Sequence, residues 1–300
     1  MSRNIYKPEI SELSRIKDRI SFLFIEKGKI TKDSNALLIT DEEGETVIPP
    51  SAFLVLMLGP GTYITQRAIQ TAAESGMQIV WCGEGGTRFY AGGRALNGNT
   101  ELLLRQADVV SNTQKRISAA RRMYGLRFPD ADLSKMHIKA MLGAEGTRMQ
   151  EVYRKYAEEY RVRWDGRVYD VNDYFAGDDI NRAISSANAC MYGICRAVTF
   201  ALGLSPGLGI IHSGNEESFV HDIADLYKAD ISIRTAFQIV SEGSGYLEKE
   251  VRTRLRDRFK ETKLPQKIVQ DIFYVLQEDE DEESQQLMTK VTSLQQLSRL

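Results

Sequence analysis

The segment GGRALNGNT at residues 92–100 separates two kinds of sequence pattern, and the change across it indicates the fold class. Before it, from about residue 20, short runs of apolar and β-branched residues alternate with turn residues, which is typical of β-strands. One helical stretch, residues 65–75, interrupts these strands. After the segment, apolar residues recur at spacings of three and four, which is typical of helices. We predict an α+β protein with a β-rich domain over residues 1–95 and a helical domain over residues 96–277.

The composition of the 300-residue chain is that of a globular protein, with 42% hydrophobic and 27% charged residues. Its net charge of -2 includes the acidic run EDEDEE at residues 278–283, and the rest of the chain carries a net charge of +4. We predict an acidic, disordered tail over residues 278–300, with docking to a basic partner as the alternative.

The sequence has neither an apolar run of about 18 residues nor a signal-peptide pattern, so we expect a cytoplasmic protein. The three cysteines, Cys82, Cys190 and Cys195, have spacings that match no zinc site. We expect them to be buried and free of disulfides, as is usual in a reducing compartment.

Glu145 lies on the apolar side of a helix predicted over residues 145–160. Four apolar residues share its stripe at helical spacings: Met149, Val152, Tyr156 and Tyr160. A carboxylate turned away from water needs a cation beside it, because an unpaired buried charge is costly. The positive partner is either Arg148, one turn further on, or a metal ion, and periodicity does not distinguish the two.

Asp222 and Asp225 are three residues apart, so a helix places both carboxylates on one face. A divalent cation relieves the repulsion between two such acids, and oxygen ligands with one imidazole suit Mg²⁺ or Mn²⁺. Either His212, which lies just before a tight turn, or His221, four residues before Asp225, could supply that imidazole. Spacing alone makes the two histidines equal candidates, and a lone histidine is more often a hydrogen-bonded residue near the core than a ligand.

A helix predicted from Leu247 to Lys263 has an apolar stripe of residues that recur every four positions: Leu247, Val251, Leu255 and Phe259. A basic stripe lies beside it, formed by Lys249, Arg252, Arg256, Lys260 and Lys263. Such a stripe fits a phosphate backbone, although a solvated helix face is the more usual explanation.

Four sequence blocks resemble the CRISPR-associated integrase of the spacer-adaptation machinery, subtype I-E. They are GEGGTRFYAGG (83–93), GAEGTRMQEVY (143–153), GDDINRAISSANACMYG (177–193) and IIHSGNEESFVHDIADLYK (210–228). The similarity runs in order from about residue 5 to about residue 276. The resemblance implies a β-rich domain followed by a helical catalytic domain, which agrees with the pattern of the sequence.

The resemblance also implies residue roles. Glu145, His212 and Asp225 are expected to hold the catalytic Mg²⁺ or Mn²⁺, and Asp222 to assist beside them, which favours His212 over His221. Arg88, Lys228 and Arg252 are expected to contact DNA, as is Arg256 of the same basic stripe. Tyr192 is expected near the active site, with core packing as the alternative.

The implied reaction inserts short foreign DNA segments into a CRISPR array. The 3′-hydroxyl of the incoming DNA attacks a phosphodiester of the repeat, and a bound metal ion would stabilise the charge that develops. The implied partners are DNA duplexes with 3′ overhangs, CRISPR repeat DNA, a second copy of the chain and a small ferredoxin-like CRISPR-associated dimer. Lys27 departs from the family pattern, in which we expect an aromatic residue that stacks on a frayed duplex end.

Three other functions compete with this interpretation. A nuclease would use the same metal site for hydrolysis without integration, and a non-catalytic DNA scaffold would use only the basic helix. A nucleotide-binding module is the third, because residues 53–81 predict a strand, a Gly-Pro-Gly turn, a helix and a strand. That segment has no GxGxxG and no phosphate-loop lysine, and its proline removes a backbone donor from the turn.

Overall fold

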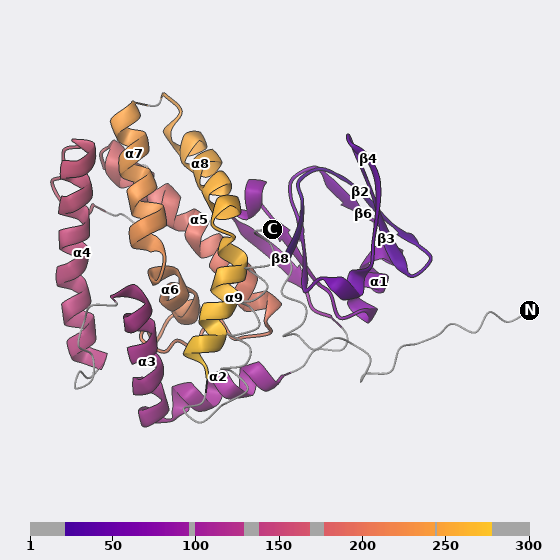
Figure 1. Ribbon diagram of the computed structural model, residues 1–300, viewed down its shortest axis with the longest axis horizontal. Coiled ribbons are helices and arrows are strands. Elements are labelled where there is room, and N and C mark those ends of the chain that lie inside the picture. The colour runs from indigo at the N-terminus through magenta and orange to yellow at the C-terminus, as the bar shows by residue number, and fades with distance from the viewer. Residues whose placement is uncertain (1–21, 96–99, 129–137, 169–176, 244, 278–300) are drawn as a thin grey trace, which may run out of the picture. The chain divides into compact units, whose positions relative to one another are not determined.

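The computed structural model describes residues 22–95, 100–128, 138–168, 177–243 and 245–277. They divide into two compact units: residues 22–82 with 90–95 form a β-rich unit, and residues 83–89 with those from 100 onward form a helical unit. The α+β fold class predicted from the sequence is confirmed (Figure 1). The division assigns residues 83–89 to the helical unit, whereas the sequence pattern groups everything up to residue 95 with the strands. The acidic run at 278–283 lies outside the described residues.

The β-rich unit contains two four-stranded sheets and one helix, α1 (Gln66–Glu74). In the first sheet the order is β1 (Phe22–Ile25), β5 (Val55–Leu58), β7 (Gln78–Cys82) and β8 (Phe89–Gly93), and β5 pairs in parallel with both β1 and β7. In the second sheet the order is β4 (Gly44–Ile48), β3 (Ala36–Asp41), β2 (Gly28–Asp33) and β6 (Thr62–Ile64). The hydroxyl of Thr65 accepts a hydrogen bond from the Ala68 amide and caps the first turn of α1.

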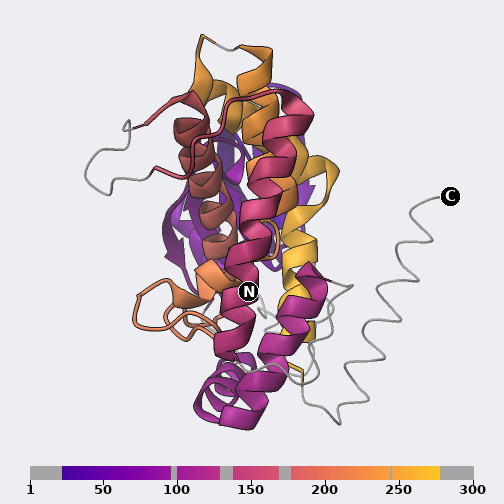
Figure 2. The ribbon, with the colours of Figure 1, turned by 90° about the vertical axis from the view of Figure 1, so that its left-hand side faces the viewer.

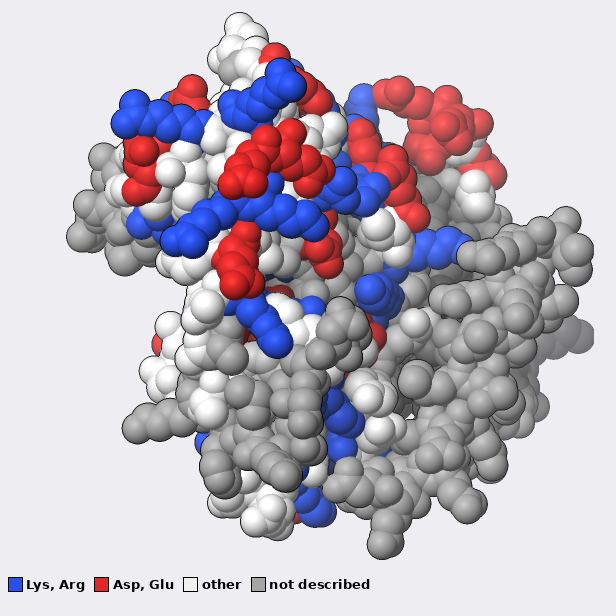
Figure 3. Space-filling view, turned by 60° about the vertical axis from the view of Figure 1, so that its left-hand side comes forward, with Lys and Arg blue, Asp and Glu red and all other residues white. Residues whose placement is uncertain are grey.

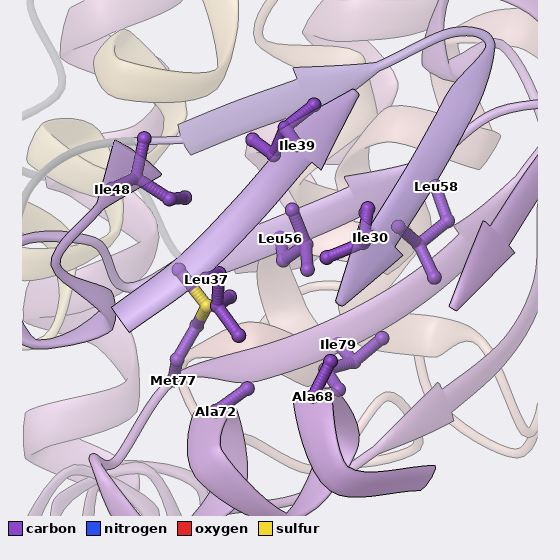
Figure 4. Close-up of a cluster of buried hydrophobic side chains, with 10 residues drawn as sticks. All are labelled: Ile30, Leu37, Ile39, Ile48, Leu56, Leu58, Ala68, Ala72, Met77 and Ile79. Carbon is purple, nitrogen blue, oxygen red and sulfur yellow. The ribbon is translucent and has the colours of Figure 1, made fainter. Parts of the chain in front are cut away.

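The core of this unit forms where side chains of both sheets meet α1 (Figure 4). Alternate residues of β3 are buried, as period-two packing requires, and β5 is buried along its whole length, as befits a central parallel strand. The cluster comprises Ile30, Leu37, Ile39, Ile48, Leu56, Leu58, Ala68, Ala72, Met77 and Ile79.

The arrangement that the competing nucleotide-binding interpretation requires differs from the structure at the Gly-Pro-Gly turn. The turn leads into the short strand β6 rather than directly into a helix. Its Gly59 amide donates to the carbonyl of Ile25 at 2.8 Å, so this backbone donor is used within the protein. A phosphate-binding turn needs amides that point at the ligand from a helix start, and this segment is built differently.

The helical unit is arranged around α5 (Asp179–Ala201), which packs against the five described helical elements that follow it in the sequence (Figure 1). These are α6 (Ser218–Asp225), the π-helix η5 (Lys228–Ile233), α7 (Arg234–Glu242), α8 (Leu247–Glu261) and α9 (Leu264–Val275). Small buried residues on α5, including Ala183, Ala187 and Ala197, allow these neighbours to approach closely. The carboxylate of Asp178 accepts from the Asn181 amide and caps the start of α5.

The described residues of this unit also form the α-helices α2 (Glu101–Ser111), α3 (Thr113–Arg127) and α4 (Ile138–Tyr160). Figure 2 shows α4 along one side of the helical unit, with α3 packed beside it. Because α4 begins at Ile138, Glu145 lies inside this helix and not at its start. None of the described helices is both long and apolar enough to cross a membrane.

Candidate active site

The loop between α5 and α6 carries His212 and is irregular in structure. At Gly209 the chain passes so close to itself that a Cβ atom would lie 2.3 Å from the His212 carbonyl oxygen and 2.6 Å from the Ser218 Cβ. The next residue, Ile210, is fully buried. The loop therefore needs a glycine at its closest approach, and an apolar side chain anchors it directly afterwards.

Asp222 organises this loop from α6. Its Oδ2 atom accepts hydrogen bonds from the amides of Ile210 at 2.5 Å and Ile211 at 3.0 Å, and its Oδ1 atom accepts the His212 amide at 3.0 Å. The His212 ring Nδ1 lies 2.7 Å from the same Oδ1. The Asp222 side chain is fully buried. The carboxylate oxygens accept three N–H groups. In the contact with the ring, Oδ1 likewise acts as the acceptor for the hydrogen on Nδ1, and this bond orients the imidazole.

The other ring nitrogen of His212 faces Asp225, whose Oδ2 lies 4.0 Å from Nε2. The hydrogen bond to Asp222 is the main cause of a raised pKa at His212; burial opposes it, and the charges of Asp222, Asp225 and Glu145 add to it. The ring thus has one α6 carboxylate beside each nitrogen, and the charge of Glu145 on α4 also acts on it. Of the two candidate histidines, His212 is the one that approaches Asp225 in this way.

Lys228 occupies the opposite side of Asp225. Its Nζ lies 2.7 Å from Asp225 Oδ1 and 4.4 Å above the centre of the Tyr192 ring. Burial lowers the pKa of Lys228, but the charge of Asp225 and the contacts with Asp225 and Tyr192 outweigh it, so the pKa is raised. Lys228 is therefore a largely buried cation within the site.

The rings of His221 and Tyr192 pack against each other beside this cluster, with centres 4.9 Å apart and planes tilted by 57°. Burial lowers the pKa of His221, and the nearby charge of Lys228 lowers it further. Tyr192 thus lies next to the acidic cluster, between Lys228 and His221.

Glu145 is held by α3. The Tyr124 hydroxyl donates to its Oε2 at 2.7 Å, and the Arg127 guanidinium pairs with its Oε1. Both side chains of this ion pair are largely buried. Arg148, one of the two positive partners that the helical spacing left open, lies elsewhere: its guanidinium is 4.6 Å above the Phe128 ring, and the α3 side chains reach the Glu145 carboxylate from the facing helix.

The described residues bring His212, Asp222 and Asp225 together, whereas Glu145 is turned toward Arg127. Among them, no three His, Cys, Asp or Glu side chains lie close enough to enclose a metal ion. The chemistry of the donor set nevertheless fits Mg²⁺ or Mn²⁺: two carboxylates and one imidazole whose Nδ1 is fixed by a further carboxylate. In the structure the Glu145 carboxylate is bound by Arg127 and Tyr124.

The predicted DNA contacts Arg88 and Arg252 both belong to the helical unit, and the 3-10 helix η4 (Glu84–Gly86), just before Arg88, packs against α8, which carries Arg252. Burial raises the pKa of the Cys190 thiol to about 11, and both arginines are close enough to oppose that rise. Arg88 is exposed on the loop at 83–89, which packs so tightly on α5 that a Cβ at Gly193 would lie 2.5 Å from the Thr87 carbonyl oxygen.

Arg256 pairs with Glu84 at 3.3 Å and with Asp257 at 3.0 Å. The apolar stripe of α8 is buried as predicted, and on the basic stripe Lys249 and Lys260 are exposed. On the face drawn in Figure 3, basic and acidic side chains alternate, and the described residues there do not form a field of one sign. In the β-rich unit, Lys27 is exposed and pairs with Glu42 at 2.5 Å.

Sequence reasoning missed Tyr124 and Arg127. They are three residues apart on one face of α3, so their shared direction is readable from helical spacing. Their target is not, since Glu145 lies on a different helix. The cysteines match their prediction: Cys82, Cys190 and Cys195 are all buried free thiols.

Comparison with known proteins gives consistent matches over most of the chain. Residues 22–128 and 130–262 match the family described as "CRISPR associated protein Cas1". A CRISPR-associated endonuclease Cas1 of Clostridium sp. strain SY8519 is 42% identical over 262 residues, which is 87% of each chain. The Cas1 endonuclease of Escherichia coli K12 is 36% identical over 255 residues, covering 85% of this chain and 84% of the relative. A crystal structure of a TtCas1-DNA complex superposes with a TM-score of 0.81 at 36% identity, covering 88% of this chain and 98% of that one.

Proposed function

The chain belongs to the family of CRISPR-associated Cas1 proteins, and from this membership we propose that it is a metal-dependent DNA integrase and endonuclease of subtype I-E. The proposed reaction inserts short DNA segments into a CRISPR array. The 3′-hydroxyl of the incoming strand attacks a phosphodiester of the repeat; one P–O bond forms, another breaks, and the displaced strand leaves with a 3′-hydroxyl. No external energy source is needed because the number of phosphodiester bonds is unchanged.

One observation carries the proposal: His212 and Asp225 face each other at 4.0 Å, while Asp222 fixes the far side of the imidazole. In the proposal His212, Asp225 and Glu145 hold Mg²⁺ or Mn²⁺. A bound ion would lower the pKa of the attacking hydroxyl and stabilise charge on the transition state. Asp222 orients His212, and the buried ammonium of Lys228 holds one oxygen of Asp225, so that the other oxygen is directed toward the histidine.

DNA binding in the proposal extends from this cluster to Arg88, Arg252 and Arg256, with Lys228 and Tyr192 at the reacting strand. The proposed basic track consists of these three arginines: Arg88 follows η4, which packs against α8, the helix that carries Arg252 and Arg256, and the acidic residues Glu84 and Asp257 lie among them. The TtCas1-DNA complex supports DNA as the ligand class. As partners we propose duplexes with 3′ overhangs, CRISPR repeat DNA, a second copy of the chain and a small ferredoxin-like CRISPR-associated dimer.

The test incubates the purified chain and that partner dimer with a short fluorescent duplex, supercoiled repeat-containing plasmid and Mn²⁺ or Mg²⁺. We expect label to become joined to the plasmid, and we expect joining to be lost in His212→Ala. The matched control is His221→Ala, which removes a neighbouring imidazole outside the proposed ligand set. Joining by His212→Ala at the rate of the parent protein would refute the assignment.

The same reaction distinguishes the two remaining functions. A nuclease alone would nick or linearise the plasmid and leave the label unjoined. A non-catalytic scaffold would shift the duplex on a gel equally well in the parent protein and in His212→Ala, with no covalent product from either.

A further inference from the structure

We propose that Gln106 and Arg116 are positioning residues that hold the His212 loop by its carbonyl groups and thereby set the direction of the His212 imidazole. The inference rests on the proposed function only in giving the loop a catalytic role. Both residues come from helices far from the loop in sequence, and neither has a part in the proposed chemistry.

Gln106 on α2 forms hydrogen bonds with the beginning of the loop. Its Nε2 donates to the carbonyl oxygens of Ser205 at 2.9 Å and Leu208 at 3.0 Å, and its Oε1 accepts the Ser205 amide at 2.9 Å. The side chain is fully buried and shares the apolar face of α2 with Leu102 and Val109. An amide in such a place is costly unless it is hydrogen-bonded, and the loop backbone provides all three of these bonds.

Arg116 on α3 forms a hydrogen bond with the next part of the loop. Its Nε donates to the Ile210 carbonyl oxygen at 2.6 Å, across 94 residues of sequence. Ile210 lies two residues before His212, and its own amide is bound by Asp222. The peptide groups on both sides of Ile210 are thus fixed, one by a cation and the other by an anion.

Together these contacts hold the loop from two directions. Asp222 on α6 binds the amides of residues 210, 211 and 212, whereas Gln106 and Arg116 on α2 and α3 bind the carbonyls of residues 205, 208 and 210. A loop held only through its amides could still rotate about the Asp222 carboxylate. Bonds on the carbonyl side remove that freedom, so they fix where Nε2 of His212 points.

The experiment reads the His212 ring directly, in the full-length chain without metal or DNA. The chain has three histidines, so histidine-selective ¹⁵N labelling gives three ring systems, and loss of one in His212→Gln assigns the signal. At about pH 9, well above the ordinary histidine pKa of about 6.5, we expect the parent ring to carry its hydrogen on Nδ1, facing Asp222. This signature does not depend on activity, so its outcome is separate from that of the integrase proposal.

The test variants are Arg116→Met and Gln106→Met, which keep an unbranched side chain and remove the donors. We expect the His212 signals to broaden or to move toward the Nε2–H tautomer, and the joining rate to fall by about 10- to 100-fold, the usual effect of misplacing a reacting group. Arg116→Lys retains a donor and should restore part of both properties. If Arg116 acted through packing alone, Arg116→Met and Arg116→Lys would have the same effect on the His212 signals and on the joining rate.

The matched control is Arg122→Met. Arg122 also lies on α3 and also donates to carbonyl oxygens, those of Val275 and Gln277 at the end of α9, away from the His212 loop. It should lower the melting temperature but leave the His212 signals as in the parent. The inference is overturned if Arg116→Met and Gln106→Met, folded by circular dichroism, give parental His212 signals, or if Arg122→Met disturbs them equally.

Discussion

The Nδ1 atom of His212 lies 2.7 Å from Oδ1 of Asp222, and that carboxylate also accepts the backbone amides of three consecutive loop residues. Asp222 is therefore directed at the loop and the rear of the imidazole, whereas Asp225, one turn further on, is directed at the front. Two acids on one face of a short helix consequently have different tasks.

Replacement of Asp222 by asparagine should reduce both stability and joining. An amide offers one acceptor oxygen in place of two, so its NH₂ group would face N–H donors that now bind a carboxylate. We expect the free energy of unfolding to fall by about 2–4 kcal/mol, since buried donors left without an acceptor cost about 1–3 kcal/mol each. Urea unfolding measures this loss, and Asp257→Asn, at an exposed site on α8, is the control that should remain at parental stability.

Removal of the guanidinium in Arg127→Met should increase the affinity for Mn²⁺. Glu145 is paired with Arg127 in a largely buried position, so the variant leaves a carboxylate that lacks its cation. The metal-free protein should lose about 3–5 kcal/mol of stability, and metal binding should recover part of that loss. Isothermal titration with Mn²⁺ tests this against Arg148→Met, whose arginine lies over Phe128; equal affinities in the two variants would contradict it.

Gly209→Ala should distort the catalytic loop. The added Cβ would lie 2.3 Å from the His212 carbonyl oxygen, and relieving such overpacking costs about 1–3 kcal/mol. Thermal unfolding and joining should both be impaired. The same substitution at Gly207, where the nearest atom is 3.5 Å away, should leave both near the parental values.

Asp271→Asn should stabilise the protein at neutral and alkaline pH. Burial raises the pKa of Asp271, although the hydrogen bond from Tyr227 and the charge of Lys267 oppose the rise. A carboxyl whose pKa is higher in the folded chain stabilises the fold below its unfolded pKa and loses that contribution as the pH rises through the folded value.

In the parent protein the Tyr227 hydroxyl donates to Asp271 at 2.6 Å. Asparagine keeps an acceptor oxygen for this hydroxyl and has no charge to bury. The variant should melt above the parent protein at about pH 8, and the difference should close as the pH falls toward about 4, the ordinary range for aspartate. A difference that is constant with pH would contradict the assignment. Asp165→Asn, at an exposed ion pair, should show no such trend.

Arg252→Glu should weaken DNA binding if the proposed basic track is correct. Loss of one phosphate contact should lower the affinity several-fold and reduce the slope of log K against log salt by about 1. Fluorescence anisotropy from low to moderate salt measures both quantities. Arg258→Glu makes the same charge change on α8 at an arginine paired with Glu261, and it should leave the slope unchanged.

Much of the fold could be predicted because its determinants are local. The change of pattern near residue 95 gives the α+β class, and the spacing of Leu247, Val251, Leu255 and Phe259 gives the buried side of α8. Helix ends were less accurate: the helix predicted from residue 145 begins at Ile138, and Gly143 and Gly146 lower the helix propensity of its first turns.

The site was only partly predictable. Helical spacing correctly placed Asp222 and Asp225 together on one helix, and the resemblance favoured His212, which the structure places beside them. Spacing gave no sign that Asp222 faces the loop backbone, that Lys228 is buried against Asp225, or that Arg127 rather than Arg148 pairs with Glu145.

The positions of most helices and strands, and the side of each on which the reactive side chains lie, can be read from the sequence because backbone geometry within one element repeats with a fixed period. The partners of these side chains follow from tertiary packing: Arg127 for Glu145, Asp222 for the His212 ring, and Gln106 and Arg116 for the loop carbonyls. These pairs join separate elements, so they depend on how the helices pack, and the spacing of residues within one element does not show that packing.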